Sequence, residues 1–346
     1  MPSTAADPIV RRVNRFDAAI VGGGIVGLAC ALEARRRGLS VCVLERGEAG
    51  SGATHAAAGV LAADRETPSF TALARRSAEL WPSFAAELGD VGYTRCGSLA
   101  RSFDGTRPEL EGDWLDGRAC RALEPGIADD CLGGVLIAAD AQVDPRRAVH
   151  ALAALAGDAL RTNADVVDLG PQHVELADGT QIEADRVVLA AGAWASRRLA
   201  RRLPVRPVKG QTLRLRGALP ATRIIRSEHV YVVPRATGET VIGATVEEAG
   251  FDEAATDEAT EELLRQAIRA VPAVERLELV EAVAGLRPGT PDDGPLIGEW
   301  EGLVVAGGHF RNGILLAPVT AVAVAAPLVG EPPPPETAPF DPQRFG

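Results

Sequence analysis

The stretch that decides the fold runs from Phe16 to Glu45 and reads FDAAIVGGGIVGLACALEARRRGLSVCVLE. Its first apolar run, Phe16–Val21, predicts a short buried parallel strand, and Ser40–Glu45 predicts a second one. Between them, Ile25–Arg37 has the length and composition of a helix, which Gly38 closes. Two parallel strands joined by a helix form a βαβ unit, so the chain is expected to begin with an α/β domain.

Three glycines in this unit, Gly22, Gly24 and Gly27, form a GxGxxG motif. Gly22 permits the tight turn, Gly24 lets the backbone approach a pyrophosphate, and Gly27 lets the helix pack on the strand. The helix N-terminus offers N–H groups and partial positive charge to the phosphates. Glu45 follows Gly27 by 18 residues and is placed to accept hydrogen bonds from ribose hydroxyls, which argues against a 2′-phosphate. The unit therefore predicts dinucleotide binding in a Rossmann-like domain.

The composition is that of an ordinary globular protein, with 346 residues, of which 46% are apolar and 24% charged. This length exceeds one typical core and predicts two domains, or one large α/β unit with an inserted partner. The net charge of −11 argues against a nucleic-acid footprint and against a basic patch for membranes. We therefore expect neither nucleic acid nor membrane as a partner.

The cysteines indicate a reducing compartment. The five cysteines form no CxxC pair and no metal-like spacing with the five histidines, so we expect free thiols, no metal site and a cytoplasmic protein. Residues 1–14 lack the apolar segment of an export signal. Residues 313–330 are uncharged and about as long as a membrane span, but Pro318 and Pro327 interrupt them. This segment is therefore expected to be a buried core helix.

The rest of the chain alternates between two kinds of pattern. Further helices are expected near Ser69–Leu88, Asp144–Leu160 and Asp257–Ala270, whereas the short runs from Tyr93 to Leu136 suit an antiparallel sheet. The predicted fold is an α/β fold in which a Rossmann-like (GxGxxG) domain that binds the dinucleotide is interleaved with an antiparallel-sheet substrate domain. Its expected parts are residues 15–84, 141–203 and 283–330 for the first domain, 85–140 and 204–282 for the second, and 1–14 and 331–346 as tails.

Two further segments favour FAD over NAD as the dinucleotide. Ser51–Gly59 (SGATHAAAG) is a loop of small residues that could let the backbone lie against a flavin ring. Asp185–Trp194 (DRVVLAAGAW) is a buried strand that ends in a glycine turn, far along the chain from the first motif. Two cofactor-facing segments so far apart suit FAD, which is long and enclosed.

Four runs in the C-terminal half carry a resemblance to a known family. They are Tyr231–Arg235 (YVVPR), Ile242–Thr245 (IGAT), Gly285–Thr290 (GLRPGT) and Gly307–Pro318 (GGHFRNGILLAP). With the early glycines, they closely resemble the thiamine-pathway glycine oxidases of the D-amino-acid-oxidase superfamily. The resemblance extends from about Phe16 to Gly330.

The resemblance implies a pocket for an amino-acid substrate. Arg287 matches the arginine that binds the substrate carboxylate, which suits a guanidinium that can form two parallel hydrogen bonds. Tyr231 is expected to give the carboxylate a further hydrogen bond. His229 would share the strand face of Tyr231 at the pocket mouth or be a partly exposed structural residue, and Arg311 would shape the pocket or hold its loop. Val246 stands where glycine oxidases are expected to have methionine.

The cofactor is expected to be FAD, bound without a covalent link. His55 raises the alternative of a tether, but the histidine that holds flavin in dimethylglycine-dehydrogenase-like relatives aligns with Ala56. The expected cofactor-binding residues are Gly22, Gly24, Ile25, Val26, Gly27, Glu45, Arg46, Thr54, Ala57, Ala58, Gly59, Val167, Ala191, Gly192, Trp194, His309, Arg311, Asn312, Gly313 and Ile314.

The function implied by the resemblance is oxidative deamination of glycine, with sarcosine and small D-amino acids as further candidate substrates. Oxygen would be the acceptor, hydrogen peroxide would be released, and the imine would feed the thiazole branch of thiamine synthesis. Two alternatives stay open. One is a related amine or D-amino-acid dehydrogenase with another acceptor, and the other is a flavin-binding protein without amine turnover. Homo-oligomerisation is also left open.

Overall fold

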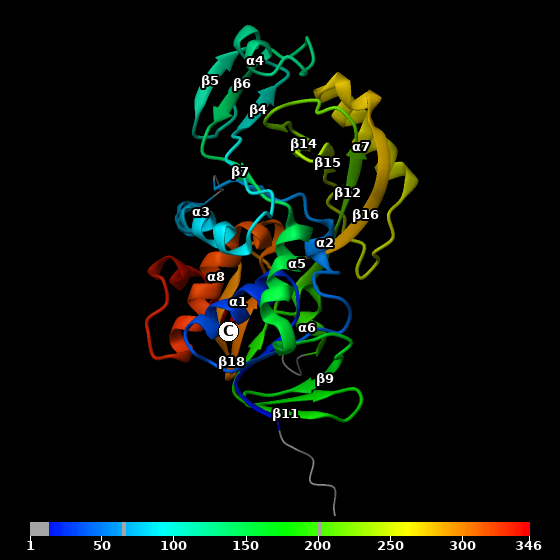
Figure 1. Ribbon diagram of the computed structural model, residues 1–346. Coiled ribbons are helices and arrows are strands. Elements are labelled where there is room, and N and C mark those ends of the chain that lie inside the picture. The colour runs from blue at the N-terminus through cyan, green and yellow to red at the C-terminus, as the bar shows by residue number, and fades with distance from the viewer. Residues whose placement is uncertain (1–13, 64–66, 199–202) are drawn as a thin grey trace, which may run out of the picture.

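The computed structural model describes residues 14–63, 67–198 and 203–346. The described chain forms two bodies, each built on an eight-stranded sheet. In Figure 1 the first sheet, with helices α1, α5 and α8, forms the lower body, and the second sheet, with α4 and α7, forms the upper one. The predicted tail at residues 1–14 lies outside the described residues except for Asn14, which begins the first strand.

The first sheet carries the dinucleotide motif. Its strand order is β17-β18-β11-β1-β2-β8, and outside this order β10 pairs with β11 and with β9. Strands β18, β11, β1, β2 and β8 run parallel, whereas β17, β9 and β10 pair antiparallel. The bounds are β1 Asn14–Val21, β2 Val41–Leu44, β8 Leu160–Arg161, β9 Val166–Leu169, β10 His173–Leu176, β11 Gln181–Leu189, β17 Leu296–Trp300 and β18 Leu303–Gly307.

Helices cover this sheet because the contact removes the apolar side chains of both the sheet and the helices from water. One large cluster of buried side chains joins β1 and β2 to four helices, namely α1 Ile25–Arg36, α3 Pro68–Leu88, α5 Pro145–Ala156 and α8 Gly313–Leu328. The βαβ unit predicted from Phe16–Glu45 is confirmed. The short helices and turns are α2 Ala53–Ala56, α6 Ala195–Arg198, η1 Gly157–Ala159, η2 Gly192–Trp194 and η4 Phe310–Asn312.

Helix α8 is the core helix that its sequence predicts. The segment Phe310–Leu328 is long and apolar enough to cross a membrane, but 72% of it is buried inside the protein. Pro318 is tolerated because side chains of α3 form hydrogen bonds with the backbone groups next to it. Ser77 Oγ and Trp81 Nε1 donate to the Leu315 carbonyl at 2.7 and 2.9 Å, and the Val319 N–H donates to Ser77 Oγ at 3.3 Å.

The second sheet is assembled from two separate parts of the chain. Its order is β16-β12-β15-β14-β13-β4-β6-β5, and every pair is antiparallel except β13 with β4. This confirms the interleaved antiparallel sheet. The bounds are β4 Ser98–Ser102, β5 Asp113–Asp116, β6 Gly133–Ile137, β12 Arg206–Arg216, β13 Ile224–Arg226, β14 Tyr231–Pro234, β15 Glu239–Gly243 and β16 Glu278–Gly289, with α4 Gly117–Leu123, α7 Asp257–Ala270 and η3 Pro272–Arg276 beside them.

Two details differ from the sequence expectation. The boundary expected at residue 283 falls inside β16, whose pairing with β12 continues to Gly289 because the two strands match over their whole length. The Pro-rich end expected as a loose tail instead forms η5 Pro335–Phe340 and η6 Pro342–Phe345. Phe340 is buried edge-on against Phe70 with ring centres 5.6 Å apart, and Arg344 bonds Asp292 at 2.9 Å. A two-stranded sheet of β3 Val60–Leu61 and β7 Ala141–Gln142 lies apart from both large sheets.

Candidate functional site

A cavity of about 1460 Å³ receives residues from both bodies. One end is formed by the β1–α1 turn and the carboxyl end of β2, and the other by β12, β14 and β16 of the second sheet. The Ser51–Gly59 segment and the start of α8 line the space between these ends. Two distant segments of the first body and three strands of the second sheet therefore face one continuous cavity.

The glycine turn forms the first end of the cavity. Gly22 has φ +115°, and a Cβ there would lie 2.4 Å from the Ala190 carbonyl oxygen. A Cβ at Gly27 would lie 2.0 Å from the Gly22 carbonyl oxygen, so this glycine serves helix packing. Gly24 is the N-cap residue of α1 and lines the cavity with Ile25 and Val26. Gly27 is not among the described residues of the wall, and its assignment to the cofactor stays a prediction.

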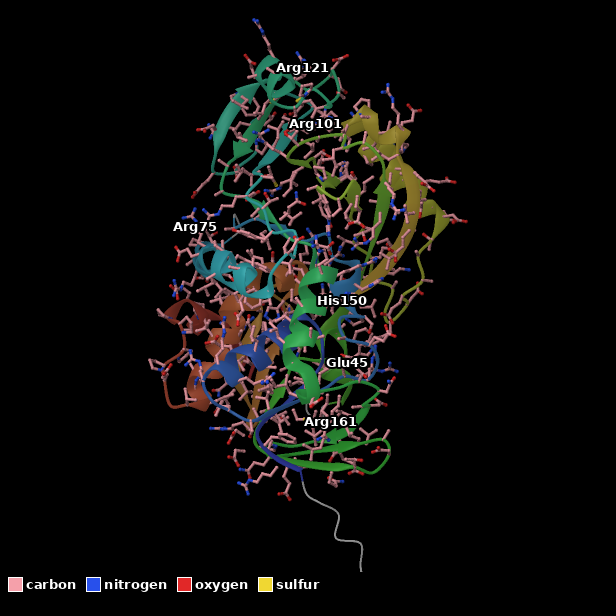
Figure 2. The ribbon with its side chains drawn as sticks, viewed as in Figure 1. Glu45, Arg75, Arg101, Arg121, His150 and Arg161 are labelled. Atoms are coloured by element: carbon pink, nitrogen blue, oxygen red, sulfur yellow. The ribbon has the colours of Figure 1, made fainter. Side chains whose placement is uncertain are left out.

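Glu45 lies in the wall beside this turn, and Figure 2 shows it in the lower body. Its Oε2 accepts from the Gly23 N–H at 2.7 Å, and its Oε1 accepts from the Gly47 N–H at 2.9 Å. Each carboxylate oxygen retains a second lone pair, so Glu45 can also accept from ribose hydroxyls. The cradle and its carboxylate therefore fit the pyrophosphate and ribose of a dinucleotide.

Arg46 and Trp194 close the cavity beyond Glu45. The Arg46 guanidinium lies 3.9 Å from the centre of the Trp194 ring, and both residues line the cavity together with Ala191 and Gly192. Val166 also lines this part, whereas Val167 is 41% exposed and lies outside the wall formed by the described residues. The assignment of Val167 to the cofactor therefore stays a prediction. Successive side chains of strand β9 point to opposite faces.

The loop that was expected against a flavin ring lines the middle of the cavity through Thr54, Ala57, Ala58 and Gly59. Thr54 Oγ1 accepts from the N–H of Ile25 at 3.2 Å, which ties this loop to the start of α1. Arg235, from the second body, donates to the Ala58 carbonyl at 3.0 Å.

His55 points out of this loop and away from the cavity. Its Nε2 lies 3.4 Å from Glu281 Oε1, and burial lowers the pKa of the imidazole. Among the described residues, Thr54 and Ala56 belong to the cavity wall and His55 does not. This placement supports the non-covalent alternative for the cofactor.

The start of α8 lines the cavity opposite the loop. His309, Arg311, Asn312, Gly313 and Ile314 all contribute to the wall. The His309 ring is buried with its Nε2 3.0 Å from Thr320 Oγ1, and burial lowers its pKa to about 4. A neutral His309 leaves the positive potential at this position to the helix N-terminus and to Arg311.

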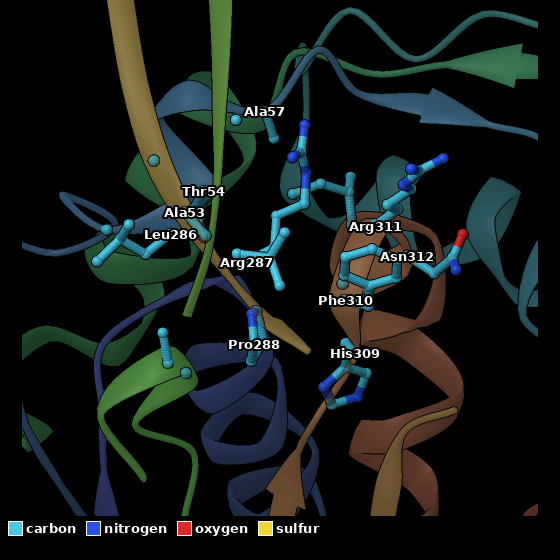
Figure 3. A pocket seen from close by; sticks show the side chains of 18 of the residues that line it. Ala53, Thr54, Ala57, Leu286, Arg287, Pro288, His309, Phe310, Arg311 and Asn312 are labelled. Atoms are coloured by element: carbon cyan, nitrogen blue, oxygen red, sulfur yellow. The ribbon is translucent and has the colours of Figure 1, made fainter. Parts of the chain in front are cut away.

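Arg287 and Tyr231 both line the part of the cavity wall that the second sheet forms, here called the floor. Arg287 Nη1 donates to the Thr245 carbonyl at 2.9 Å and to the Lys209 carbonyl at 3.3 Å. Figure 3 shows Arg287 between strand β16 and the start of α8, where Arg311 lies. Burial lowers the pKa of Arg287 and raises that of the Tyr231 hydroxyl. The positive charges of Arg287 and Arg311 oppose the rise for Tyr231, so the three groups share one electrostatic environment.

Two glycines make room for these side chains. A Cβ at Gly210 would lie 2.1 Å from Arg287 Nη1, and a Cβ at Gly243 would lie 2.5 Å from the Tyr231 hydroxyl oxygen. A guanidinium and a phenol can therefore lie side by side under the cavity. Such a pair can bind a carboxylate through charge-assisted and neutral hydrogen bonds.

A family model described as "DAO: FAD dependent oxidoreductase" matches residues 17–326. The chain belongs to this family of FAD-dependent oxidoreductases. Glycine oxidase from Geobacillus kaustophilus is 35% identical over 90% of this chain and 92% of that protein. Its crystal structure has a TM-score of 0.87 to this fold and covers 95% of this chain and 98% of that one. The predicted superfamily, fold class and FAD cofactor are thereby confirmed.

Other relatives of this oxidoreductase are larger. The bifunctional protein ThiO/ThiG of Trichormus variabilis is 37% identical over 95% of this chain and 55% of that protein. The chain thus spans about half the length of the bifunctional relatives that it matches. L-proline dehydrogenase from P. horikoshii has a TM-score of 0.86 at 22% identity, which shows a shared fold alone.

Two expected pocket residues of the oxidoreductase lie at the cavity mouth. His229 lines the cavity, but it precedes β14, its side chain is 60% exposed, and Glu228 lies 3.6 Å from its Nε2. The expectation that it shares a strand face with Tyr231 is therefore wrong. Val246 also lines the cavity and is 51% exposed.

Some residues that shape the oxidoreductase site were missed by the sequence analysis. Gly210 was not singled out, and Gly243 was quoted only within the IGAT run and without a role, although a glycine inside a strand often marks the close approach of another group. The carbonyls of Lys209 and Thr245 carried no sequence signal, because any residue type supplies a carbonyl.

Proposed function

We propose that this oxidoreductase catalyses the oxidative deamination of glycine with release of hydrogen peroxide. The observation that carries the proposal is the Arg287–Tyr231 floor, which opens into the same cavity as the glycine turn and Glu45. A relative named glycine oxidase that matches over nine-tenths of both chains supports the choice of substrate. FAD, when bound, would accept a hydride from the substrate Cα and pass the electrons to oxygen.

The chain's own residues bind and orient the amino acid. Arg287 binds the carboxylate, and Tyr231 donates a further hydrogen bond, because its raised pKa keeps the phenol protonated. These bonds to the carboxylate fix the position of the Cα, because glycine has no side chain that the protein could bind. An amine that enters neutral requires no general base.

The start of α8 and Arg311 supply positive potential on the other side of the cavity. Negative charge that develops on the cofactor ring during reduction would be stabilised by this potential. The remaining cofactor-binding assignments, from the glycine turn to Trp194, belong to the same proposal. Sarcosine and small D-amino acids are further candidate substrates, as the resemblance to glycine oxidases implies.

The proposed context is the thiazole branch of thiamine synthesis, since relatives matching this chain carry the name ThiO/ThiG. We also infer a cytoplasmic protein, because α8 is buried in the core and the five cysteines are free. The division into interleaved FAD-binding and substrate-binding domains is part of this proposal, with β16 assigned to the substrate-binding domain.

A peroxide-coupled screen of glycine, sarcosine, N-ethylglycine, D-alanine, D-proline and their L-forms tests the proposal. We expect glycine to bleach the flavin band without air and to give one peroxide per turnover in air. Bleaching without peroxide would identify a dehydrogenase with another acceptor. A flavin band that no amine bleaches would reveal a flavin-binding protein without amine turnover.

A further inference from the structure

The Arg287 guanidinium is bonded by a loop, residues 244–248, that the IGAT run covers only as far as Thr245. Strand β15 ends at Gly243, and the chain then folds back along β12. Lys209 and Glu247 exchange two backbone hydrogen bonds of 2.9 Å each. This return brings the Thr245 carbonyl to 2.9 Å from Arg287 Nη1, next to the Lys209 carbonyl. The position of residues 244–248 therefore sets the position of Arg287.

Gln211 fastens this loop from the opposite face of β12. Gly210 and Thr212 line the cavity, whereas Gln211 points away from it and is only 1% exposed. Its N–H donates to Thr245 Oγ1 at 2.9 Å, and its side-chain Nε2 donates to Glu247 Oε1 at 2.9 Å.

The same Glu247 oxygen is also bonded by the Thr245 hydroxyl, and Gln211 Oε1 accepts from the Thr256 N–H at 2.8 Å. Gln211 thus connects two residues of the loop, Thr245 and Glu247, and the N-cap of α7, Thr256, to β12.

We propose that Gln211 and Glu247 are positioning residues that hold Arg287 in place through the Thr245 carbonyl and so set the affinity for the substrate carboxylate. This inference rests on the proposed function, because it assumes that Arg287 binds a carboxylate. The Glu247 charge also raises the pKa of Arg287, which agrees with their closeness. Because enzymes depend on geometry within about 1 Å, a small shift of this loop weakens the grip on the substrate.

The loop has a second anchor that separates positioning from folding. Lys209 is buried, and its Nζ lies 2.5 Å from Asp252 and 3.8 Å from Glu247. A variant that loses the Gln211–Glu247 bond keeps this ion pair and the backbone bridge. We therefore expect the loop to shift in such a variant and the protein to stay folded.

A charge swap tests the inference in the holoenzyme. Gln211→Glu places two carboxylates against each other, and their repulsion displaces the loop. We expect KM for glycine to rise about tenfold or more, as for a weakened charge-assisted bond, with kcat within about threefold of wild type. The double variant Gln211→Glu/Glu247→Gln reverses donor and acceptor, and it is expected to recover most of the loss. Gln211→Met keeps about the same side-chain volume but loses the side-chain hydrogen bonds. It therefore tests the effect on KM independently if Gln211→Glu does not fold.

The matched control is Glu124→Gln, a buried carboxylate that bonds Thr222 and Arg223 away from the cavity. We expect this control to leave KM unchanged. Equal effects of Glu124→Gln and Gln211→Glu, or a double variant no better than the single one, would overturn the inference.

Acetate is used as a carboxylate ligand that needs no turnover. Its binding can therefore test the positioning of Arg287 separately from the proposed glycine oxidation. Its binding to the holoenzyme is read from the flavin absorbance spectrum, whether or not glycine is oxidised. Weaker acetate binding in Gln211→Glu, with recovery in the double variant, would support positioning even if glycine is not the substrate. Acetate affinity equal in all variants, or no acetate binding by wild type, would overturn it.

Discussion

Substituting Gly210 by alanine moves Arg287 without removing it. The new Cβ would lie 2.1 Å from Nη1 and 2.2 Å from both Cζ and Nη2 of Arg287. Carbon contacts settle at about 3.5 Å, so the guanidinium must move by roughly 1 Å or more. A misplacement of about 1 Å in a positioning group can cost about 100-fold in rate. We therefore expect kcat/KM for glycine to fall about 100-fold in Gly210→Ala.

The fold should tolerate this change, because the clash is with the far end of a flexible side chain. The free energy of unfolding is expected to stay within about 1 kcal/mol of wild type, since alanine also restricts the unfolded chain. Steady-state peroxide production, FAD content and thermal unfolding are measured on the same preparation. Gly47→Ala is the matched control, because its Cβ would meet only ordinary contacts at 3.6 Å or more. A Gly210→Ala enzyme with the wild-type kcat/KM would refute the role assigned to Arg287.

Four further predictions concern single groups in the cavity. Arg287→Ala should weaken glycine binding, read from anaerobic flavin reduction, by about tenfold to several hundredfold, with partial recovery in Arg287→Lys. Tyr231→Phe should weaken glycine binding about tenfold or less. An Arg287→Ala variant that binds glycine with wild-type affinity would show that Arg287 does not belong to the site. Glu45→Ala should weaken FAD binding by about 1–3 kcal/mol in a flavin-fluorescence titration, and unchanged affinity would mean that Glu45 does not contact the ribose. His309 has a pKa near 4 in the fold against 6.5 for the free side chain, so the unfolded state binds the extra proton. Stability should therefore fall by about 3 kcal/mol as the pH drops from 6.5 to 4, and His309→Gln should show a shallower decline in urea unfolding.

Local signals predicted the first body well. The turn at Gly22–Gly27 has a sequence dictated by its own geometry, so β1, α1 and β2 begin and end within about two residues of the expected bounds. Helix α7 spans the predicted residues 257–270, because its Thr256 cap and amphipathic pattern are local features. Such elements carry their signal within one turn of helix or one strand.

Features that depend on distant partners were not predictable in the same way. Strand β12 begins at Arg206, although only Leu213–Arg216 has a strand-like pattern. Its first half contains Pro207, Lys209 and Gly210, which are unfavourable in strands and are held there by pairing with β16. The C-terminal residues contain no periodic pattern, yet Phe340 packs on Phe70, which lies some 270 residues earlier. Neither contact leaves a trace in the neighbouring sequence.

The substrate end of the cavity shows why motifs identify only part of a site. Side chains normally stand upright on a sheet, but a glycine beside them lets them lie along it. Tyr231 pairs across strands with Gly243, and Arg287 pairs with Val208, one diagonal step from Gly210. The four strands involved are neighbours in the order β16-β12-β15-β14, although they come from residues 206–289. The register of this sheet therefore turns two ordinary side chains into one floor. A one-residue slip of β12 against β16 would separate Arg287 from its glycine while leaving every motif in the sequence intact.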